Sequence, residues 1–262
     1  MTAPRRAETI EDVLAMVRVV VDDAVAAGSR TGFFAALYRQ ITVGVARAID
    51  DGVFDDGERM SRLDAAFANR YLEALHSWQT GGEPSRSWRT AFRACEQHQP
   101  VLVQHLVLGV NAHINLDLAV AAARTCPGRE IAGLKHDFDL VNDLLTQGLR
   151  EVQAALADLS PLLGALDVVL GRLDAEIIGF NVVTARAEAW EAAELLARQP
   201  TDAQEATVKM LDRYAQGLAR AVLAPPFPLP AALDLLRATE RTGVAETIQR
   251  LDRAPAPGVT DR

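Results

Sequence analysis

Apolar residues recur along most of the chain at spacings of three and four, the period that places them on one face of an α-helix. Clusters of Gly, Pro and Asp separate these stretches, and neither a β-hairpin pattern nor an internal repeat is found. A stiff extended strap is expected at 225–230, followed by one or two further helices and a flexible tail at 254–262. The pattern predicts helices over residues 9–27, 31–49, 56–78, 84–97, 100–125, 130–159, 161–198 and 201–222, with a bend in the seventh near Gly164, Gly171 or Gly179.

Composition agrees with a helical fold. Hydrophobic residues make up 49% of the 262 residues and charged residues 24%, the balance of a globular protein. Aromatic residues are only 5%, while alanine and leucine dominate, which favours helix over sheet. Because no linker is long enough to divide the chain, we expect a single all-α domain over residues 1–262, a bundle of about eight to ten helices.

The fifth predicted helix, over about residues 100–125, is apolar on every side. Such a helix is typical of the centre of a bundle, where it has neighbours all around it. Its stretch 101–123 is the most apolar of the chain, but the polar residues within it make a membrane span implausible. Buried polar groups need partners, so those on this helix are informative.

Charge and cysteine content narrow the class of protein. The net charge of −8 would repel a phosphate backbone, so nucleic acid is not expected as a partner. Cys95 and Cys126 lie outside any C-x-x-C motif, and we expect two reduced thiols in the core. The N-terminal residues lack the apolar run of a secretory signal, so we expect a cytoplasmic protein without a membrane partner.

The central helix carries two polar pairs four residues apart. His113 and Asp117 share one face, and Asn111 and Asn115 share another about 200° away. We expect the asparagines to bridge to neighbouring helices and His113 and Asp117 to face a cavity. A histidine beside a carboxylate is a general acid–base pair, because the carboxylate orients the imidazole and stabilises its charged form. The alternative is a hydrogen-bond network with a purely structural role in the core.

Three further polar residues interrupt apolar stripes on other predicted helices. Asp64 lies within the stripe of 56–78, Arg186 within that of 161–198, and Asp139 flanks that of 130–159 together with Asn142. Since buried charges are rarely left unpaired, we expect Arg186 to pair with Asp64, Asp117 or Asp139, or to bind an anionic group of a substrate. The neighbouring His136, Asp137 and Asp143 are expected on the solvated surface. We predict that His113, Asp117, Asp64, Asp139 and Arg186 converge on one region with a ligand cavity beside His113.

These residues also fall in a recognisable order along the chain. Asp64 with Phe67 and Tyr71, then Trp88, then the run N-A-H-I-N-L-D-L from Asn111 to Leu118, then Asp139-x-x-Asn142, then Arg186 with Trp190, resembles a bacterial family found mainly in actinomycetes. That family is catalogued only as a domain of unknown function. The resemblance covers about residues 30–195 and implies an all-helical domain whose shared feature is this set of polar core residues. It implies no activity, and Val110 stands where the family is expected to have methionine.

Other sequence motifs give less support to alternative chemistries. A single divalent metal ion could be held by His113, Asp117 and a carboxylate such as Asp64 or Asp139, since mixed nitrogen and oxygen ligands suit Zn, Mn or Fe. The chain has only five histidines, too few for the trinuclear site of helical zinc phospholipases. Phosphate-binding glycine loops, G-x-S-x-G and H-E-x-x-H are absent from the sequence.

The sequence therefore favours an enzyme that acts on a small-molecule substrate without an organic cofactor or a bound metal. His113 would be the general acid or base and Asp117 its orienting partner, in a cyclisation, elimination, isomerisation or hydrolysis. A non-catalytic binding or scaffold protein and a mononuclear metal-dependent hydrolase are the two alternatives. The pocket or polar network is expected to include Asn111, Asn115, Asp64, Tyr71, Asp139, Asn142, Arg186 and Trp190.

Overall fold

The computed structural model describes residues 6–159, 182–226 and 229–258, and the side chains of 146–159 are outside this description. Within these ranges the chain forms helices and no β-strand, as the sequence predicted. Most helix boundaries lie within three residues of the predicted ones. The α-helices are α1 (Ile10–Ala27), α2 (Thr31–Asp50), α3 (Gly57–Gln79), α4 (Arg86–Cys95), α5 (Leu102–Ala112), α6 (Ala119–Thr125), α7 (Ile131–Leu159), α10 (Val182–Arg198), α11 (Thr201–Leu223), α12 (Leu229–Thr239) and α13 (Val244–Arg253).

Local sequence signals explain where the first helices begin and end. The side chains of Thr9, Asp56 and Ser85 each accept a hydrogen bond from a backbone N–H in the first turn of α1, α3 and α4 respectively. Such capping satisfies donors that have no partner inside the helix. Gly28 ends α1 with φ of 61°, a left-handed conformation that glycine adopts without strain.

The central helix is not a regular α-helix throughout. Between α5 and α6, residues His113–Leu118 form a π-helical segment, η1. The sequence predicted the buried position of this helix but not the π-helical turn. Segments of this kind are rare and are frequently found at functional sites. The turn coincides with the residues that the sequence singled out for chemistry.

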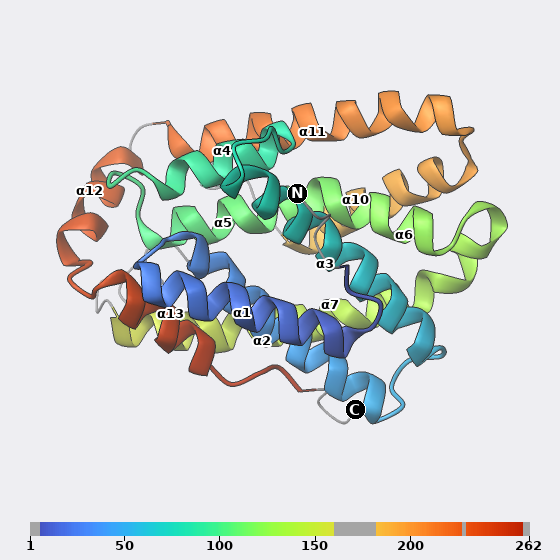
Figure 1. Ribbon diagram of the computed structural model, residues 1–262, viewed down its shortest axis with the longest axis horizontal. Helices are drawn as coiled ribbons and strands as arrows, with labels where there is room; N and C mark the ends of the chain where they lie inside the picture. Colours follow the sequence, from blue (N-terminus) through green and yellow to red (C-terminus); the bar gives the residue numbers. More distant parts are fainter. Residues whose placement is uncertain (1–5, 160–181, 227–228, 259–262) are drawn as a thin grey trace.

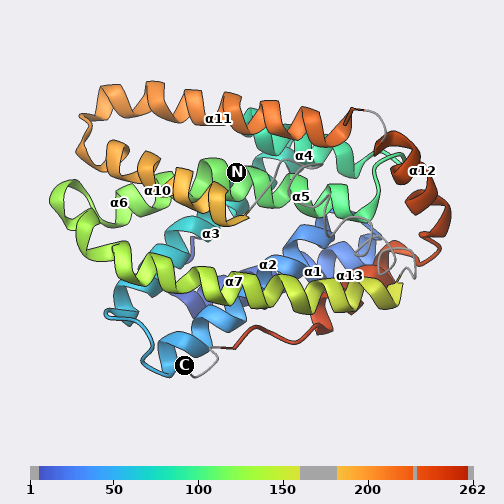
Figure 2. The ribbon, with the colours of Figure 1, turned by 180° about the vertical axis from the view of Figure 1, so that it is seen from behind.

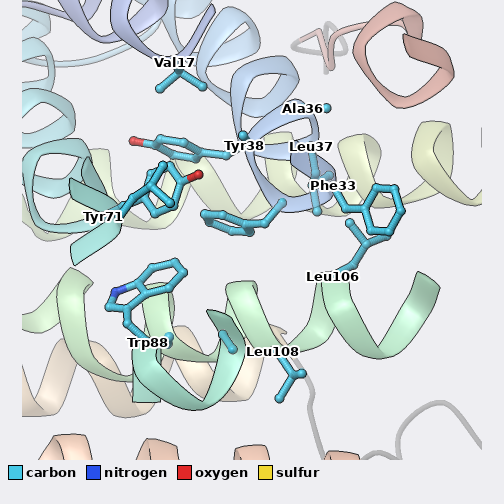
Figure 3. Packing of buried hydrophobic residues seen from close by; sticks show 14 of the residues in the cluster. Val17, Phe33, Ala36, Leu37, Tyr38, Tyr71, Trp88, Leu106 and Leu108 are labelled. Atoms are coloured by element: carbon cyan, nitrogen blue, oxygen red, sulfur yellow. The ribbon is translucent and has the colours of Figure 1, made fainter. Parts of the chain in front are cut away.

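The α5–η1–α6 helix lies inside the bundle, as the sequence predicted. It contacts α2, α3, α4, α10 and α11, and Figures 1 and 2 show α11 along one side of it and α1, α2, α7 and α13 on the other. The helix Leu102–Thr125 is long and apolar enough to cross a membrane, but 89% of its most apolar 18-residue stretch is buried within the bundle. Aromatic side chains from α2, α3 and α4 fill the space beside this helix, and Figure 3 shows Tyr38, Tyr71 and Trp88 grouped there.

The chain differs from the predicted pattern near its C-terminus. Pro225 and Pro226 lie outside the helices, but Leu229 and Pro230 already belong to α12, because proline is well tolerated in the first turn of a helix. The start of the expected flexible tail is packed: Pro257 is buried against Gly44 of α2, where a Cβ atom would lie 2.6 Å from the proline ring. The three glycines at which a bend was expected lie outside the described residues.

Candidate functional site

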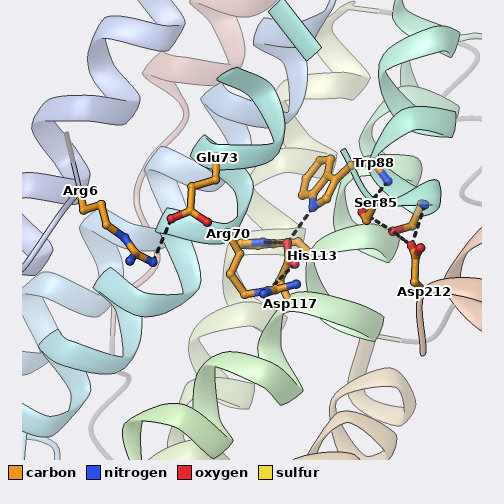
Figure 4. Close-up of polar contacts among 9 residues, drawn as sticks. Arg6, Arg70, Glu73, Ser85, Trp88, His113, Asp117 and Asp212 are labelled. Atoms are coloured by element: carbon orange, nitrogen blue, oxygen red, sulfur yellow. Dashed lines mark hydrogen bonds and ion pairs between the residues drawn. The ribbon is translucent and has the colours of Figure 1, made fainter. Parts of the chain in front are cut away.

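Asp117 is the most thoroughly hydrogen-bonded side chain of the central helix. Arg70 of α3 donates from Nε to Oδ1 at 2.8 Å, and Trp88 of α4 donates from Nε1 to Oδ2 at 2.7 Å. His113 Nδ1 lies 3.3 Å from the same Oδ2 (Figure 4). Asp117 is only 1% exposed, so a charged partner and two further donors stabilise a carboxylate that is shielded from water.

The position of Trp88 depends on a second carboxylate. Asp212 of α11 accepts hydrogen bonds from the backbone N–H groups of Arg86 and Ser87 and from the Ser87 hydroxyl, all at 2.9 Å (Figure 4). A carboxylate at the start of a helix also interacts favourably with the helix dipole. Asp212 therefore fixes the first turn of α4, and with it the indole that contacts Asp117.

Aromatic rings surround the imidazole of His113. Phe67 stacks on it with ring centroids 3.5 Å apart and planes 11° apart. Tyr38 and Phe34 of α2 meet it edge to face at 4.7 and 5.5 Å. These contacts hold the ring in one orientation, and the hydrogen bond to Asp117 places the proton of a neutral imidazole on Nδ1.

The other ring nitrogen of His113, Nε2, has no hydrogen-bond partner in the part of the chain that the structure describes. Nε2 is buried, and no described residue donates to it or accepts from it. Burial lowers the pKa of His113 below its usual value, although the hydrogen bond to Asp117 acts in the opposite direction. A neutral imidazole with a free lone pair on Nε2 is therefore the expected form at neutral pH, and it is a proton acceptor.

A cavity of about 100 Å³ lies beside His113. Asp64, Arg186, Tyr38 and His113 are the residues with polar side-chain atoms that line it within the described part of the chain. The rest of its described wall is apolar and comes from α2, α3, α5, η1, α7 and α10: Phe34, Leu37, Ile41, Val45, Met60, Leu63, Phe67, Val110, Ile114, Leu118, Phe138, Val141, Leu145 and Val182.

Asp64 faces the same cavity, and no described residue forms an ion pair with it. Its Oδ2 atom is buried and makes no hydrogen bond to the described residues. Burial raises the pKa of Asp64 from 3.8 to about 7, because the charged form is poorly solvated there. Around neutral pH this carboxyl group is therefore a proton donor for much of the time, opposite in character to His113.

Arg186 completes the polar part of the cavity. Its Nε donates to Asn142 Oδ1 at 2.6 Å and its Nη2 to the Phe138 carbonyl oxygen at 2.7 Å. The sequence favoured an ion pair with Asp64, Asp117 or Asp139, and this expectation is wrong for the described residues. Both acceptors are uncharged, and the carboxylate of Asp117 is bound to Arg70 instead.

The two asparagines of the central helix have structural roles. Asn111 Nδ2 donates to the Ala215 carbonyl oxygen of α11 at 2.8 Å, and Asn115 Nδ2 donates to Asn111 Oδ1 at 2.9 Å. Asn111 thus bridges to a neighbouring helix as expected, but Asn115, for which the same was expected, bonds instead to Asn111 of its own helix. Neither asparagine lines the cavity.

Two acidic residues of α7 are placed differently from the expectation. Asp139 is half exposed and pairs with Lys135, so it does not join the cluster around His113. Asp137, expected at the surface, is fully buried, because the backbone N–H groups of Asp55 and Asp56 and the Arg59 side chain all donate to it.

Two aromatic residues expected in the pocket pack beside it instead. Tyr71 is buried 6.3 Å from His113 between ring centroids, and its hydroxyl has no partner among the described residues. Trp190 packs on Phe138 with ring centroids 4.9 Å apart. Neither side chain lines the cavity.

The possible metal ligands named from the sequence do not come together. His113 and Asp117 are bonded to each other, the second Asp117 oxygen is bound to Arg70, and Asp139 points away. Within the described residues, a cluster of potential ligands occurs at Asp55, His136 and Asp137. Arg59 already occupies the buried carboxylate of that cluster, and a cation there would be repelled by it.

Several residues of the candidate site were not predicted from the sequence. Arg70 lies beside the apolar stripe of α3, and its long side chain reaches Asp117 from that edge. Phe34 and Tyr38 look like ordinary core residues of α2, and no motif marks them. The signal for Arg70 was available: it lies three residues after Phe67, one turn along the face that packs on the central helix.

Comparison with known proteins gives a family and no activity. The model of a family described as a family of unknown function, DUF5995, matches residues 10–225, and the chain therefore belongs to this family. Neither the curated proteins nor the solved structures contain a significant match.

Proposed function

We propose that this member of DUF5995 is a cofactor-independent enzyme that moves protons on a small molecule bound in the cavity beside His113. The observation that carries this proposal is the presence, on one apolar cavity, of two titratable groups with pKa values shifted in opposite directions, each with a buried atom that has no hydrogen-bond partner among the described residues. Pairs of groups whose surroundings push their pKa values apart are typical of acid–base sites. We also take the run from Asn111 to Leu118 as the signature of the family, which we expect mainly in actinomycetes.

His113 supplies the base in this mechanism. Its Nε2 accepts a proton from the substrate, and the resulting imidazolium is stabilised by Asp117 through Nδ1–H. Arg70 and Trp88 hold Asp117 in place, so the carboxylate does not need to reorganise when the charge on the ring appears.

Asp64 supplies the acid. When protonated, its carboxyl group donates a proton to a second atom of the substrate, and the reaction leaves His113 positive and Asp64 negative. Return of one proton from His113 to Asp64 restores both groups, so the cycle needs no other reactant. The apolar wall keeps water away from the reacting atoms, which favours an isomerisation or elimination over a hydrolysis.

Exchange with solvent deuterium tests this proposal even while the substrate is unidentified. The purified protein is incubated in D₂O with a bacterial metabolite extract, and new carbon-bound deuterium is measured by mass spectrometry. We expect at least one compound to acquire deuterium, and His113→Gln to slow this about 100-fold or more, the usual contribution of a general base.

The matched control is His136→Gln. His136 is exposed, pairs with Asp55 and does not line the cavity, so its replacement should leave the exchange unchanged. Exchange at the same rate in His113→Gln would refute the role of His113. A compound that binds the protein but acquires no deuterium would refute the proposed enzymatic function and support a non-catalytic binding protein.

A further inference from the structure

Arg186 is a buried cation on the wall of an apolar cavity. Arg186 is 4% exposed and lies near the start of α10. It lines the cavity together with Phe138 and Val141 of α7. The guanidinium carbon lies 4.3 Å from the centroid of the Phe138 ring. Arginine in such a position is costly unless its charge is compensated.

The contacts of Arg186 hold its orientation, and none of those with described residues compensates its charge. The two hydrogen bonds, to Asn142 and to the Phe138 carbonyl, use two of the five N–H groups of a guanidinium. Among the residues that the structure describes, no carboxylate lies within ion-pair distance. Asp139, the nearest acidic influence on the pKa of Arg186, is half exposed and bound to Lys135.

Electrostatics point the same way as the geometry. Burial lowers the pKa of Arg186 from 12.5 to about 9, so the side chain is still charged at neutral pH and poorly solvated. A ligand anion in the cavity would restore the missing counter-charge. Lysine and other arginine residues are absent from the described lining, so one anionic group of single charge fits the site better than a phosphate dianion.

We propose that Arg186 binds the carboxylate of the ligand, and that the cavity accepts small apolar carboxylates. The proposal rests on the function given above, because it names the substrate class of the same site. The planar fork of arginine matches a carboxylate, and the apolar wall suits a hydrocarbon chain. An engineered cavity of about 150 Å³ holds benzene, so a cavity of about 100 Å³ suits a smaller ligand, with a chain of up to about four carbons.

The orientation of such a ligand follows from the lining. With its carboxylate at Arg186, the chain extends along the apolar wall toward His113 and Asp64. Proton transfer would then occur on the chain and not on the carboxylate. A short unsaturated or keto acid meets this requirement, since its carbon chain carries protons that a base can remove.

Calorimetric titration of the wild-type protein gives the first test. The probes are the straight-chain carboxylates from acetate to octanoate and the uncharged primary amides of the same lengths. We expect each bound carboxylate to bind about tenfold or more tightly than its amide, the ratio for a hydrogen bond to a charged group. Equal affinities, or no binding of any carboxylate at millimolar concentration, would overturn the proposal.

Two variants on the same helix give the second test. Arg186→Gln should lose the preference for carboxylate over amide, whereas Arg198→Gln, at an exposed arginine paired with Glu194, should keep it. If Arg186→Gln does not fold, Arg186→Lys keeps the charge without the fork and should bind carboxylates more weakly than the wild type. An unchanged preference in a folded Arg186→Gln would overturn the proposal.

The titrations are separate from the exchange test of the proposed function. His113→Gln should still prefer carboxylates, because the ring is not the anion-binding group. If His113→Gln loses the deuterium exchange but keeps the preference for carboxylates, the result bears on the role of His113 and not on that of Arg186. Deuterium exchange without any preference for carboxylates would support the proposed enzyme and refute the anion-binding role of Arg186.

Discussion

Burial of the Asp64 carboxyl group should make the stability of the folded protein depend on pH. Replacement by asparagine keeps the size of the side chain and removes the ionisable group. The folded protein holds this carboxyl at a pKa of about 7 against 3.8 ordinarily, so the folded state binds more protons than the unfolded state between these pH values. Stability contributed by this residue therefore falls as pH rises from about 4 to 7 and is constant above that.

The size of the effect follows from the shift. Each pKa unit corresponds to about 1.4 kcal/mol, so three units give a full cost of about 4 kcal/mol above pH 7. At pH 5 the unfolded carboxyl is already ionised while the folded one is not, and the cost is only about 2 kcal/mol. Asp64→Asn should escape both costs, so its stability relative to wild type should rise by about 2.5–3 kcal/mol from pH 5 to pH 9.

Urea unfolding followed by circular dichroism measures this difference when wild type and variant are compared at both pH values. Asp50→Asn, at the exposed end of α2, is the matched control, and its stability relative to wild type should not change with pH. A constant difference for Asp64→Asn, or one that falls with pH, would refute the reasoning. That result would mean that Asp64 is ionised in the folded protein and is stabilised by a partner other than the residues that line the cavity.

Three further predictions address the surroundings of the site. Asp117→Ala should lose about 3–5 kcal/mol in urea unfolding, because the arginine and indole donors that it binds would be left buried without a partner. Burial lowers the pKa of His105 from 6.5 to about 4, so wild type should lose about 3 kcal/mol more than His105→Leu between pH 7 and pH 4, measured by the same unfolding assay. Gly109→Ala should cost about 1–3 kcal/mol and lower the exchange activity, because the added Cβ would lie 2.5 Å from the Phe34 ring that packs on His113.

Most of the fold was readable from the sequence because it depends on local periodicity. The helix ends follow from capping side chains and glycine, and the buried central helix follows from its uniform hydrophobicity. The π-helical turn was not readable. A change from i→i+4 to i→i+5 bonding leaves the apolar pattern of a fully buried helix almost unaltered.

The candidate site was predicted in part. His113, Asp64 and Arg186 line one cavity, since each is a polar residue within an apolar stripe. Asp117 was also expected to face the cavity, and this was wrong: it does not line the cavity, because its oxygens bind Arg70, Trp88 and His113. The predicted position of Asp139 was wrong. A residue at the edge of an apolar stripe can face solvent when a neighbour such as Lys135 offers a partner. The partners of Asp117 lie 29 and 47 residues away along the chain, and only the tertiary packing brings them together.

The π-helical turn also constrains how this family can change in length. A π-helical turn holds about one residue more than an α-helical turn. Deleting one residue between His113 and Asp117 would therefore restore regular winding and leave the orientation of α6 nearly unchanged, but it would bring the two side chains to a spacing of three residues instead of four. The neighbouring α6 has no such extra residue: a deletion within it would rotate the residues that follow by about 100°, and residues 119–123 are all buried between α3 and α10. We expect family members that lack the π-helical turn to keep the packing of α6 and to lose the present contact between these two side chains.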